Sequence, residues 1–331
     1  MRIATIAAAC AALFATGAAA ETLRFADSLP ADHFFTEQAS KYWMKLVEEE
    51  TDGAVDFEHY PAQQLGKAKD MLGLVQTQTV DIAYVVPSYV SDKLPLSSVA
   101  ELPGQFATSC EGTLAYWQLA TGDGFLAKSD YRRAGVRVLF AVVMPPYQIF
   151  LREPFGSVAD LKGRKLRTSS PGQDAISEAL GAVPVRITAP ELYDALARGT
   201  VDGMVFPTAS ALAYDVAGLA KSVTRGENFG TAVLSVMISE ERWQRLPENV
   251  RAVMTRAGEE TTRHICRFAD ESTASDFEEI AAQGTAIADL SADKADIRRK
   301  SASVAETWVV DMDKRGLAGA RTFEAFQEAL R

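Results

Sequence analysis

Arg167 and the hydroxyl-bearing residues that follow it are the side chains in this sequence best placed to bind an anion. Arg167 ends the segment "RKLR", and Thr168, Ser169 and Ser170 come directly after it. A guanidinium presents a planar fork that grips a carboxylate through two parallel hydrogen bonds, and the grip strengthens where water is excluded. The alternative is that Arg167 forms an ion pair with a nearby Asp or Glu. From the residues alone the two interpretations are even.

The motifs that would indicate an enzyme are missing. The sequence has no G-x-S-x-G elbow, no H-E-x-x-H pair and no G-x-x-x-x-G-K-[ST] loop. The three histidines, His33, His59 and His264, show no spacing typical of a metal site. The segment "GDGFLA" at 122–127 fits a dinucleotide pattern, but a helical segment precedes it where a strand is required. We therefore predict no enzyme, no catalytic residue, no metal and no cofactor.

Arg167 lies within an alternation of strands and helices that covers most of the chain. The hydrophobic patterns predict strands at 22–26, 54–60, 82–86, 136–143, 147–151, 163–170, 183–187, 203–206 and 232–238. They predict helices at 34–50, 67–78, 110–128, 172–180 and 189–197, a helix that begins after Ser239, and one or two long helices within 246–284. Such alternation favours mostly parallel sheets flanked by helices, here in two units.

A repeated segment supports the division into two units. "TQTVDIAYVVP" at 77–87 is followed about 120 positions later by "ARGTVDGMVFP" at 197–207. In both, a helical run leads through Thr-Val-Asp into a short apolar strand that ends in proline. Ligands of open parallel sheets bind outside the carboxyl ends of the strands. The ends "YVVP" and "MVFP" are therefore expected to lie beside one cleft between two lobes.

Size, charge and the N-terminus restrict the class of protein further. A chain of 331 residues exceeds the usual size of one core, which favours two domains. Its net charge of −10 argues against nucleic-acid binding. Arg2, an Ala-rich apolar run and the small residues before Glu21 predict a secretory signal peptide over residues 1–20, and no later apolar run is long enough to span a membrane. We expect an exported, periplasmic protein.

Cys110 and Cys266 are the two cysteines that would remain after export. An oxidising compartment favours a disulfide between them. The alternative is two isolated buried thiols, and we slightly favour it because more than 150 positions separate the two residues.

The segment "DLKGRKLRTSSPGQDAISEALGAVPVRITAPELYDALARGTVDGMVFP" resembles the periplasmic solute receptors of tripartite ATP-independent periplasmic (TRAP) transporters, the C4-dicarboxylate-receptor-like family. The family pattern "LKG-K-R", "LGA-PV" and "E-Y-AL--G-VDG" followed by Pro matches 161–207. The first half agrees in "YPAQQLG", "VDIAYV" and "ELP". The resemblance extends over essentially the whole chain after the signal peptide.

The resemblance implies a two-lobed α/β periplasmic binding protein, each lobe a mostly parallel sheet flanked by helices, with a long helix spanning both. We expect lobe I to comprise 21–145 and 228–268, and lobe II 146–227 and 269–331. A receptor of this kind closes on a small organic acid and delivers it to the membrane subunits of its transporter. The family's carboxylate-binding arginine corresponds to Arg167, and Ser169 is a supporting donor. We expect a monomer.

Departures from the family pattern predict the kind of ligand. Phe206 stands where many sugar-acid-binding members carry an Asn. Tyr147 stands near a second arginine that some members use, and Val86 near a polar residue of the first-lobe strand. Tyr84, with Phe34 or Phe229, would add aromatic surface. Unpaired hydroxyls cost roughly 1–3 kcal/mol each in such surroundings. The sequence therefore predicts a small monocarboxylate with an aliphatic or aromatic body rather than a sugar acid.

Two alternatives stay open at this point. A cationic or zwitterionic solute could bind among Tyr84, Tyr147 and Phe206 through cation–π contacts, with Asp27 as the counter-charge. Less favoured is an enzyme that uses His33 together with Asp27 or Asp32. His33 is a candidate for the cleft, and a histidine of the N-terminal turn without a role in binding is an equally favoured alternative.

Overall fold

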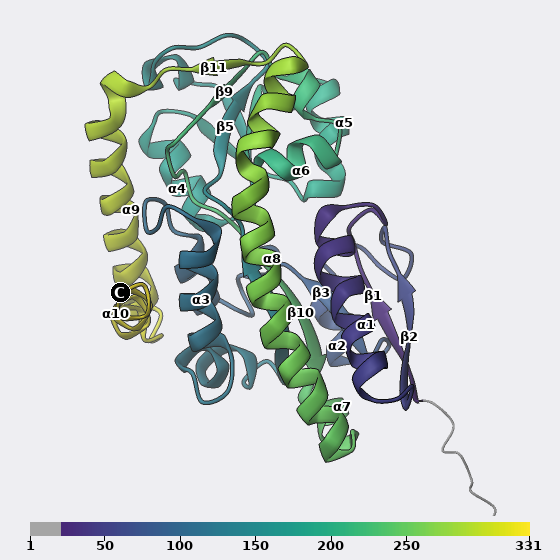
Figure 1. Cartoon of the computed structure of the whole chain (residues 1–331). Coiled ribbons are helices and arrows are strands. Elements are labelled where there is room, and N and C mark those ends of the chain that lie inside the picture. The colour runs from purple at the N-terminus through teal and green to yellow at the C-terminus, as the bar shows by residue number, and fades with distance from the viewer. Residues whose placement is uncertain (1–20) are drawn as a thin grey trace, which may run out of the picture.

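The computed structural model describes residues 21–331, and the predicted signal peptide lies outside the described residues. The described chain forms two lobes, each built on one sheet (Figure 1). The first sheet has the order β2-β1-β3-β10-β4, formed by Val55–Tyr60, Glu21–Ala26, Ile82–Val85, Val233–Ser239 and Val136–Val143. The second has the order β11-β9-β5-β8-β6-β7, formed by Ala286–Ala288, Ser222–Thr224, Gln148–Leu151, Gly203–Phe206, Lys165–Thr168 and Val183–Arg186.

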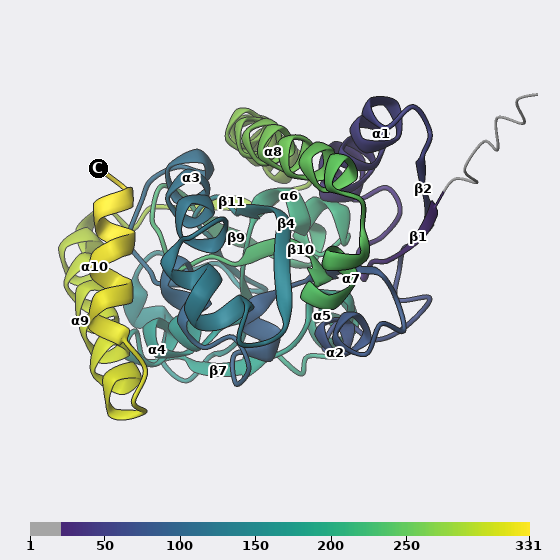
Figure 2. The ribbon, with the colours of Figure 1, turned by 90° about the horizontal axis from the view of Figure 1, so that it is seen from below.

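Helices cover both sheets, as the alternation in the sequence predicted (Figure 2). They are α1 (Lys41–Glu50), α2 (Met71–Gln76), α3 (Ser109–Ala120), α4 (Pro171–Ala179), α5 (Leu192–Ala197), α6 (Thr208–Ala213), α7 (Glu240–Arg245), α8 (Glu248–Ala282), α9 (Lys294–Lys314) and α10 (Gly319–Ala329). The segment 246–284 contains one long helix, α8. None of the helices in the described part of the chain is both long and apolar enough to cross a membrane.

The aspartate of the repeated Thr-Val-Asp joins two parallel strands in each lobe. The Asp81 carboxylate accepts a hydrogen bond from the backbone N–H of Arg24 at 2.9 Å, which ties the start of β3 to β1. The Asp202 carboxylate accepts one from the backbone N–H of Lys165 at 2.8 Å, which ties β8 to β6. Hydrogen bonds to a charged acceptor are the stronger kind. The repeat therefore fixes the register of two equivalent parallel strand pairs.

Two of the segments by which the chain crosses between the sheets pair with each other, and α8 makes a further crossing from β10 to β11. β4 leads into β5 through residues 144–147, and β9 leads into β10 through 225–232. Tyr147 N–H donates to Gly230 O at 2.9 Å, and Met144 N–H donates to Ala232 O at 3.1 Å. Gly230 has a φ of +92°, and a Cβ there would lie 2.9 Å from the Glu101 carbonyl oxygen. Only glycine fits this backbone. The paired segments 144–147 and 225–232 are called the hinge below.

β5 and β10, the strands that follow these two crossings, each run antiparallel to both of their neighbours. The other pairs within the two sheets are parallel. The predicted fold class, two lobes with mostly parallel sheets flanked by helices, is therefore confirmed. The reversed strands are those that follow the two paired crossings.

The long helix α8 extends along both lobes, and so does the pair formed by α9 and α10. α8 contacts α1, α3 and β4 beside the first sheet and α6 beside the second, and Figure 1 shows it running the length of the molecule. α9 contacts α4, and α10 returns to pack on α3; Figure 2 shows the pair as an outer layer next to α3. The lobe boundaries expected from the sequence stay a prediction, and α8 spans the expected boundary at 268–269.

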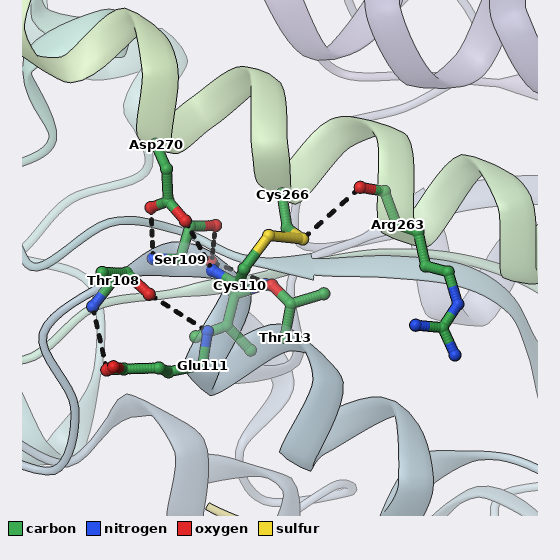
Figure 3. The surroundings of a disulfide bond; sticks show 9 residues. Thr108, Ser109, Cys110, Glu111, Thr113, Arg263, Cys266 and Asp270 are labelled. Carbon is green, nitrogen blue, oxygen red and sulfur yellow. Dashed lines mark hydrogen bonds between the residues drawn. A yellow bond between two sulfur atoms is a disulfide. The ribbon is translucent and has the colours of Figure 1, made fainter.

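A disulfide joins α3 to α8. Cys110 and Cys266 are bonded with their Cα atoms 4.8 Å apart (Figure 3). The preference for two separate thiols was therefore wrong, because the fold brings together helices that are 156 positions apart in sequence. Asp270 of α8 reinforces the junction, since its carboxylate accepts hydrogen bonds from the backbone N–H groups of Ser109 and Cys110 at 2.6 and 3.0 Å. The N-terminus of α3 is thus held by a covalent bond and a carboxylate cap.

Glu101 is a fully buried carboxyl group beside the hinge. Its Oε1 accepts a hydrogen bond from the Val233 N–H at 3.1 Å, whereas Oε2 has no partner among the described residues. Burial raises the pKa of Glu101 from 4.5 to about 8. The side chain is therefore mainly protonated in the folded protein at neutral pH.

We expect the free energy of unfolding to fall as the pH rises from 6.5 to 8. The unfolded chain releases the Glu101 proton near pH 4.5 and the folded chain only near its pKa of about 8. One such proton lowers stability by up to about 1.4 kcal/mol per pH unit in this window. Urea unfolding at several pH values measures the slope. Glu101→Gln should make the slope shallower, and an unchanged slope in this variant would contradict the assignment.

Other buried groups titrate mainly below this window. Burial lowers the pKa of His33 from 6.5 to about 3, so the unfolded state takes up its proton first and His33 costs stability as the pH falls below 6.5. Burial raises the pKa values of Asp130 and Asp276 to about 6. The lower end of the interval from pH 6.5 to 8 still contains part of these three titrations, so the difference between the unmodified protein and Glu101→Gln isolates Glu101.

Candidate functional site

A small cavity lies between the two sheets at the carboxyl ends of their parallel strands. The empty space in and around it, open solvent included, is about 320 Å³. One wall comes from segments in or after β1, β3 and the start of β10, and the other from segments beside β5, β6 and β8. The lining residues are Leu29, His33, Tyr84, Val86, Tyr89, Tyr147, Arg167, Ser169, Ala189, Phe206, Ser210, Tyr214, Ala232 and Leu234. The strand ends "YVVP" and "MVFP" both contribute, as their repetition predicted.

Arg167 is the charged residue of this cavity and is almost completely buried. Its Nε donates to the Ile187 carbonyl at 2.8 Å, and Nη1 donates to the Val205 carbonyl at 3.2 Å. The guanidinium carbon lies 4.8 Å from the centre of the Phe206 ring. These contacts hold the plane of the guanidinium in one orientation.

No carboxylate within 4 Å neutralises Arg167 in the described part of the chain. The alternative drawn from the sequence, a structural ion pair, is therefore not what the structure shows: the nearby Asp174 pairs with Arg186 instead, at 2.6 Å. A buried cation without a counter-ion is costly. The arrangement is suited to an anion that enters the cavity.

Four tyrosines surround the same cavity. The Tyr89 hydroxyl accepts hydrogen bonds from the Ala189 N–H at 3.0 Å and, at a long 3.5 Å, from Arg167 Nη2. Burial raises the pKa values of Tyr84, Tyr147 and Tyr214. These three phenols are therefore protonated at neutral pH and can donate hydrogen bonds.

His33 and Ser210 form a hydrogen bond across the cavity. His33 Nδ1 accepts from the Phe35 N–H at 3.2 Å, so the ring proton lies on Nε2. This Nε2–H faces Ser210 Oγ at 3.3 Å. The bond links the segment after β1 to α6, and the Tyr89–Ala189 contact also joins the two walls. The described structure is thus a closed arrangement of the lobes.

The structure brings together seven of the ten residues that the sequence suggested for the site. The lining residues among them are Arg167, Phe206, Tyr147, Ser169, Tyr84, Val86 and His33. Ser169 is already engaged, because its Oγ donates to Gln173 Oε1 at 3.1 Å.

Asp27, Phe34 and Phe229 do not line the cavity. Asp27 is fully buried below it, where its carboxylate accepts from the Leu29 N–H at 2.8 Å and lies 3.5 Å from His59 Nε2. Phe34 turns away and stacks on Phe268 of α8. Phe229 is buried in the hinge, where its backbone N–H donates to the Tyr147 carbonyl.

Sequence reasoning missed Tyr89, Ser210 and Tyr214 among the polar lining residues. Tyr89 comes two residues after the Pro that ends "YVVP", and Ser210 comes three residues after the Pro that ends "MVFP". The signal was therefore present: in both copies of the repeat, the first turn after the proline reaches the cavity. Tyr214 follows Ser210 by four positions, one helical turn further along.

Comparisons with known proteins agree on the class of molecule. The C4-dicarboxylate-binding periplasmic protein DctP of Rhodobacter capsulatus is 31% identical over 69% of this chain and 68% of its own length. A TRAP solute-binding protein from Rhodoferax ferrireducens, solved with copurified benzoate, is 26% identical with a TM-score of 0.84, covering 93% of this chain and 97% of that one.

A marine metagenome TRAP solute-binding protein specific for aromatic acid ligands, solved with metahydroxyphenylacetate, is also similar. It is 25% identical with a TM-score of 0.86, covering 94% of this chain and 98% of that chain. The family described as "Bacterial extracellular solute-binding protein, family 7" matches residues 25–309. The chain therefore belongs to this family, whose members include the solute receptors of TRAP transporters.

Proposed function

We propose that this protein is a periplasmic receptor that binds a small aromatic monocarboxylate and delivers it to the membrane subunits of a TRAP transporter. The observation that carries the proposal is Arg167, a buried guanidinium without a carboxylate partner among the described residues. The relatives described with benzoate and metahydroxyphenylacetate support an aromatic acid as the ligand class.

The free hydrogen-bond donors of Arg167 fit one carboxylate. A guanidinium has five N–H groups, and backbone carbonyls take one on Nε and one on Nη1. One N–H on Nη1 and both N–H groups on Nη2 remain for a ligand. Of these, Nη2 makes the long contact to Tyr89. These two nitrogens form the fork that binds a carboxylate bidentately. Tyr89, which only accepts in the structure, has its own proton available for the same anion.

The remaining walls favour an aromatic body and a single negative charge. Arg167 is the one residue carrying a permanent charge among those that line the cavity, so a second carboxylate would lack a cationic partner. Phe206, Val86 and Leu234 supply apolar surface, and the tyrosine rings supply flat surface. A cationic solute is disfavoured, because Arg167 already occupies the Phe206 face and Asp27 does not reach the cavity.

The geometry also favours a receptor over a hydrolase. Ser210 and His33 are hydrogen-bonded, but the histidine proton lies on the nitrogen that faces the serine. A general base needs a free lone pair at that position and a carboxylate on the other nitrogen. Here a backbone N–H takes the place of the carboxylate. His33 therefore acts as a donor to Ser210 and cannot activate it.

A thermal-shift panel tests the ligand class. We expect benzoate and its derivatives to raise the Tm by several degrees, because a ligand at 100 times its Kd adds about 2.7 kcal/mol to the free energy of unfolding. Succinate and choline at the same concentration should have little effect. Calorimetry should give one site per chain, and chromatography should recover the acid unchanged. A larger shift with choline than with any acid would contradict the proposal.

A further inference from the structure

We propose that the site selects aromatic acids that carry a second polar group, a ring hydroxyl, and that Tyr214 recognises it with help from Ser210. This inference rests on the proposed function and specifies the substrate class. It comes from hydrogen-bonding groups that have no partner on one wall of the cavity. This wall is formed by α6 and by Tyr214, which follows it, and it does not include the Arg167 fork.

The Tyr214 hydroxyl is buried and has no hydrogen-bond partner among the described residues. A phenol O–H can donate one hydrogen bond and accept others, and a buried hydroxyl without a partner is destabilising. Tyr214 lines the cavity, so a polar group of the ligand can supply what the protein does not. An unsubstituted aromatic ring would leave this hydroxyl unpaired in the complex.

Ser210 has hydrogen-bonding capacity left in the same place. Its Oγ accepts from His33 Nε2, which leaves the serine proton without an assigned acceptor among the described residues. Burial keeps the pKa of His33 at about 3, so the imidazole stays neutral and the direction of this bond does not change near neutral pH. A ligand hydroxyl could accept from Ser210 while donating to Tyr214.

Ring contacts connect this wall to Arg167. Phe206 lies under the guanidinium, with 4.8 Å between the ring centre and the guanidinium carbon. The Tyr214 ring is 6.2 Å from Phe206 and 5.7 Å from His33, centre to centre. Phe206 therefore lies beside both Arg167 and Tyr214. In the proposed complex, a benzene ring whose carboxylate binds Arg167 lies against Phe206 and directs its hydroxyl toward Tyr214 and Ser210.

Paired ligands give a direct test. Calorimetric Kd values are measured for benzoate and for 2-, 3- and 4-hydroxybenzoate, with the full chain and its Tyr214→Phe variant. In the unmodified protein we expect one hydroxybenzoate to bind on the order of 10-fold to 100-fold more tightly than benzoate, because a site with an unpaired polar group rejects the ligand that cannot pair with it. In Tyr214→Phe the ratio should fall toward one.

Two further variants keep the result interpretable. Tyr193→Phe removes a phenol hydroxyl from an exposed tyrosine of α5, outside the cavity, and should leave every ratio unchanged. Ser210→Ala should lower the ratio in part. Equal affinities for benzoate and all three hydroxybenzoates in the unmodified protein overturn this inference and leave the proposed function standing. A preference that survives in both Tyr214→Phe and Ser210→Ala also overturns it, whereas failure of all four acids to bind overturns both.

Discussion

Replacing Arg167 by alanine is expected to weaken the binding of an aromatic acid by about 30-fold to several thousand-fold. Truncating one partner of a buried, hydrogen-bonded charge pair costs about 2–5 kcal/mol, and every 1.4 kcal/mol is a factor of ten in Kd. Arg167 is the permanent cation of the cavity, so no neighbouring side chain takes over its role. Calorimetric titration with the acid identified by thermal shift measures the loss.

The ligand-free Arg167→Ala protein should be folded and no less stable than the unmodified protein. The guanidinium is buried without a carboxylate partner, so its removal also removes an uncompensated charge. Far-UV circular dichroism and Tm report this separately from affinity. Binding that is lost together with a large drop in Tm would indicate a structural role instead.

A matched control separates the contact between Arg167 and the ligand from the effect of changing the net charge of the protein. Arg198→Ala makes the same change of net charge at an exposed residue that follows α5, and it should alter the Kd by less than about twofold. Arg167→Lys keeps the charge and loses the planar fork, so we expect intermediate affinity. Full affinity in Arg167→Ala would contradict the assignment of this residue as the anchor.

The repeated Thr-Val-Asp shows why so much of the fold could be predicted from the sequence. Its strands are short, wholly apolar and ended by proline, so local pattern alone determines where β3 and β8 begin and end. Asp81 and Asp202 then fix the strand register through backbone hydrogen bonds. Because both copies end at the same edge of their sheets, Tyr84, Val86 and Phe206 could be placed beside one cavity before the structure was known.

The rest of the site depends on contacts between distant segments. Whether Tyr89 reaches Ala189, or His33 reaches Ser210, depends on how closely the lobes approach each other, and no local pattern records that approach. The same reason explains the misplaced Asp27: its sequence position after β1 is correct for the cleft, but its hydrogen bond to the Leu29 N–H holds the carboxylate beneath the surface. Arg167 could be placed at the cavity from the sequence, whereas its neighbours there depend on the fold.

Removing the Cys110–Cys266 disulfide should cost about 2–5 kcal/mol in the free energy of unfolding. The bond closes a loop between residues 156 positions apart, and a cross-link over a long loop reduces the entropy of the unfolded chain strongly. The Cys110→Ser/Cys266→Ser variant, compared with the oxidised protein in guanidinium titrations followed by tryptophan fluorescence, measures the difference. The oxidised protein in excess reductant should approach the value of the variant.

Ligand affinity should change little in the same double variant, because the disulfide joins α3 to α8 outside the cavity. The Asp270 carboxylate still caps the N-terminus of α3 through Ser109 and residue 110, so the junction in Figure 3 stays in place when the sulfur bond is absent. The cost therefore falls on the unfolded state rather than on the native contacts. Unchanged stability would show that the cross-link does not restrain the unfolded chain, and a large loss of affinity would show that the junction positions the lobes.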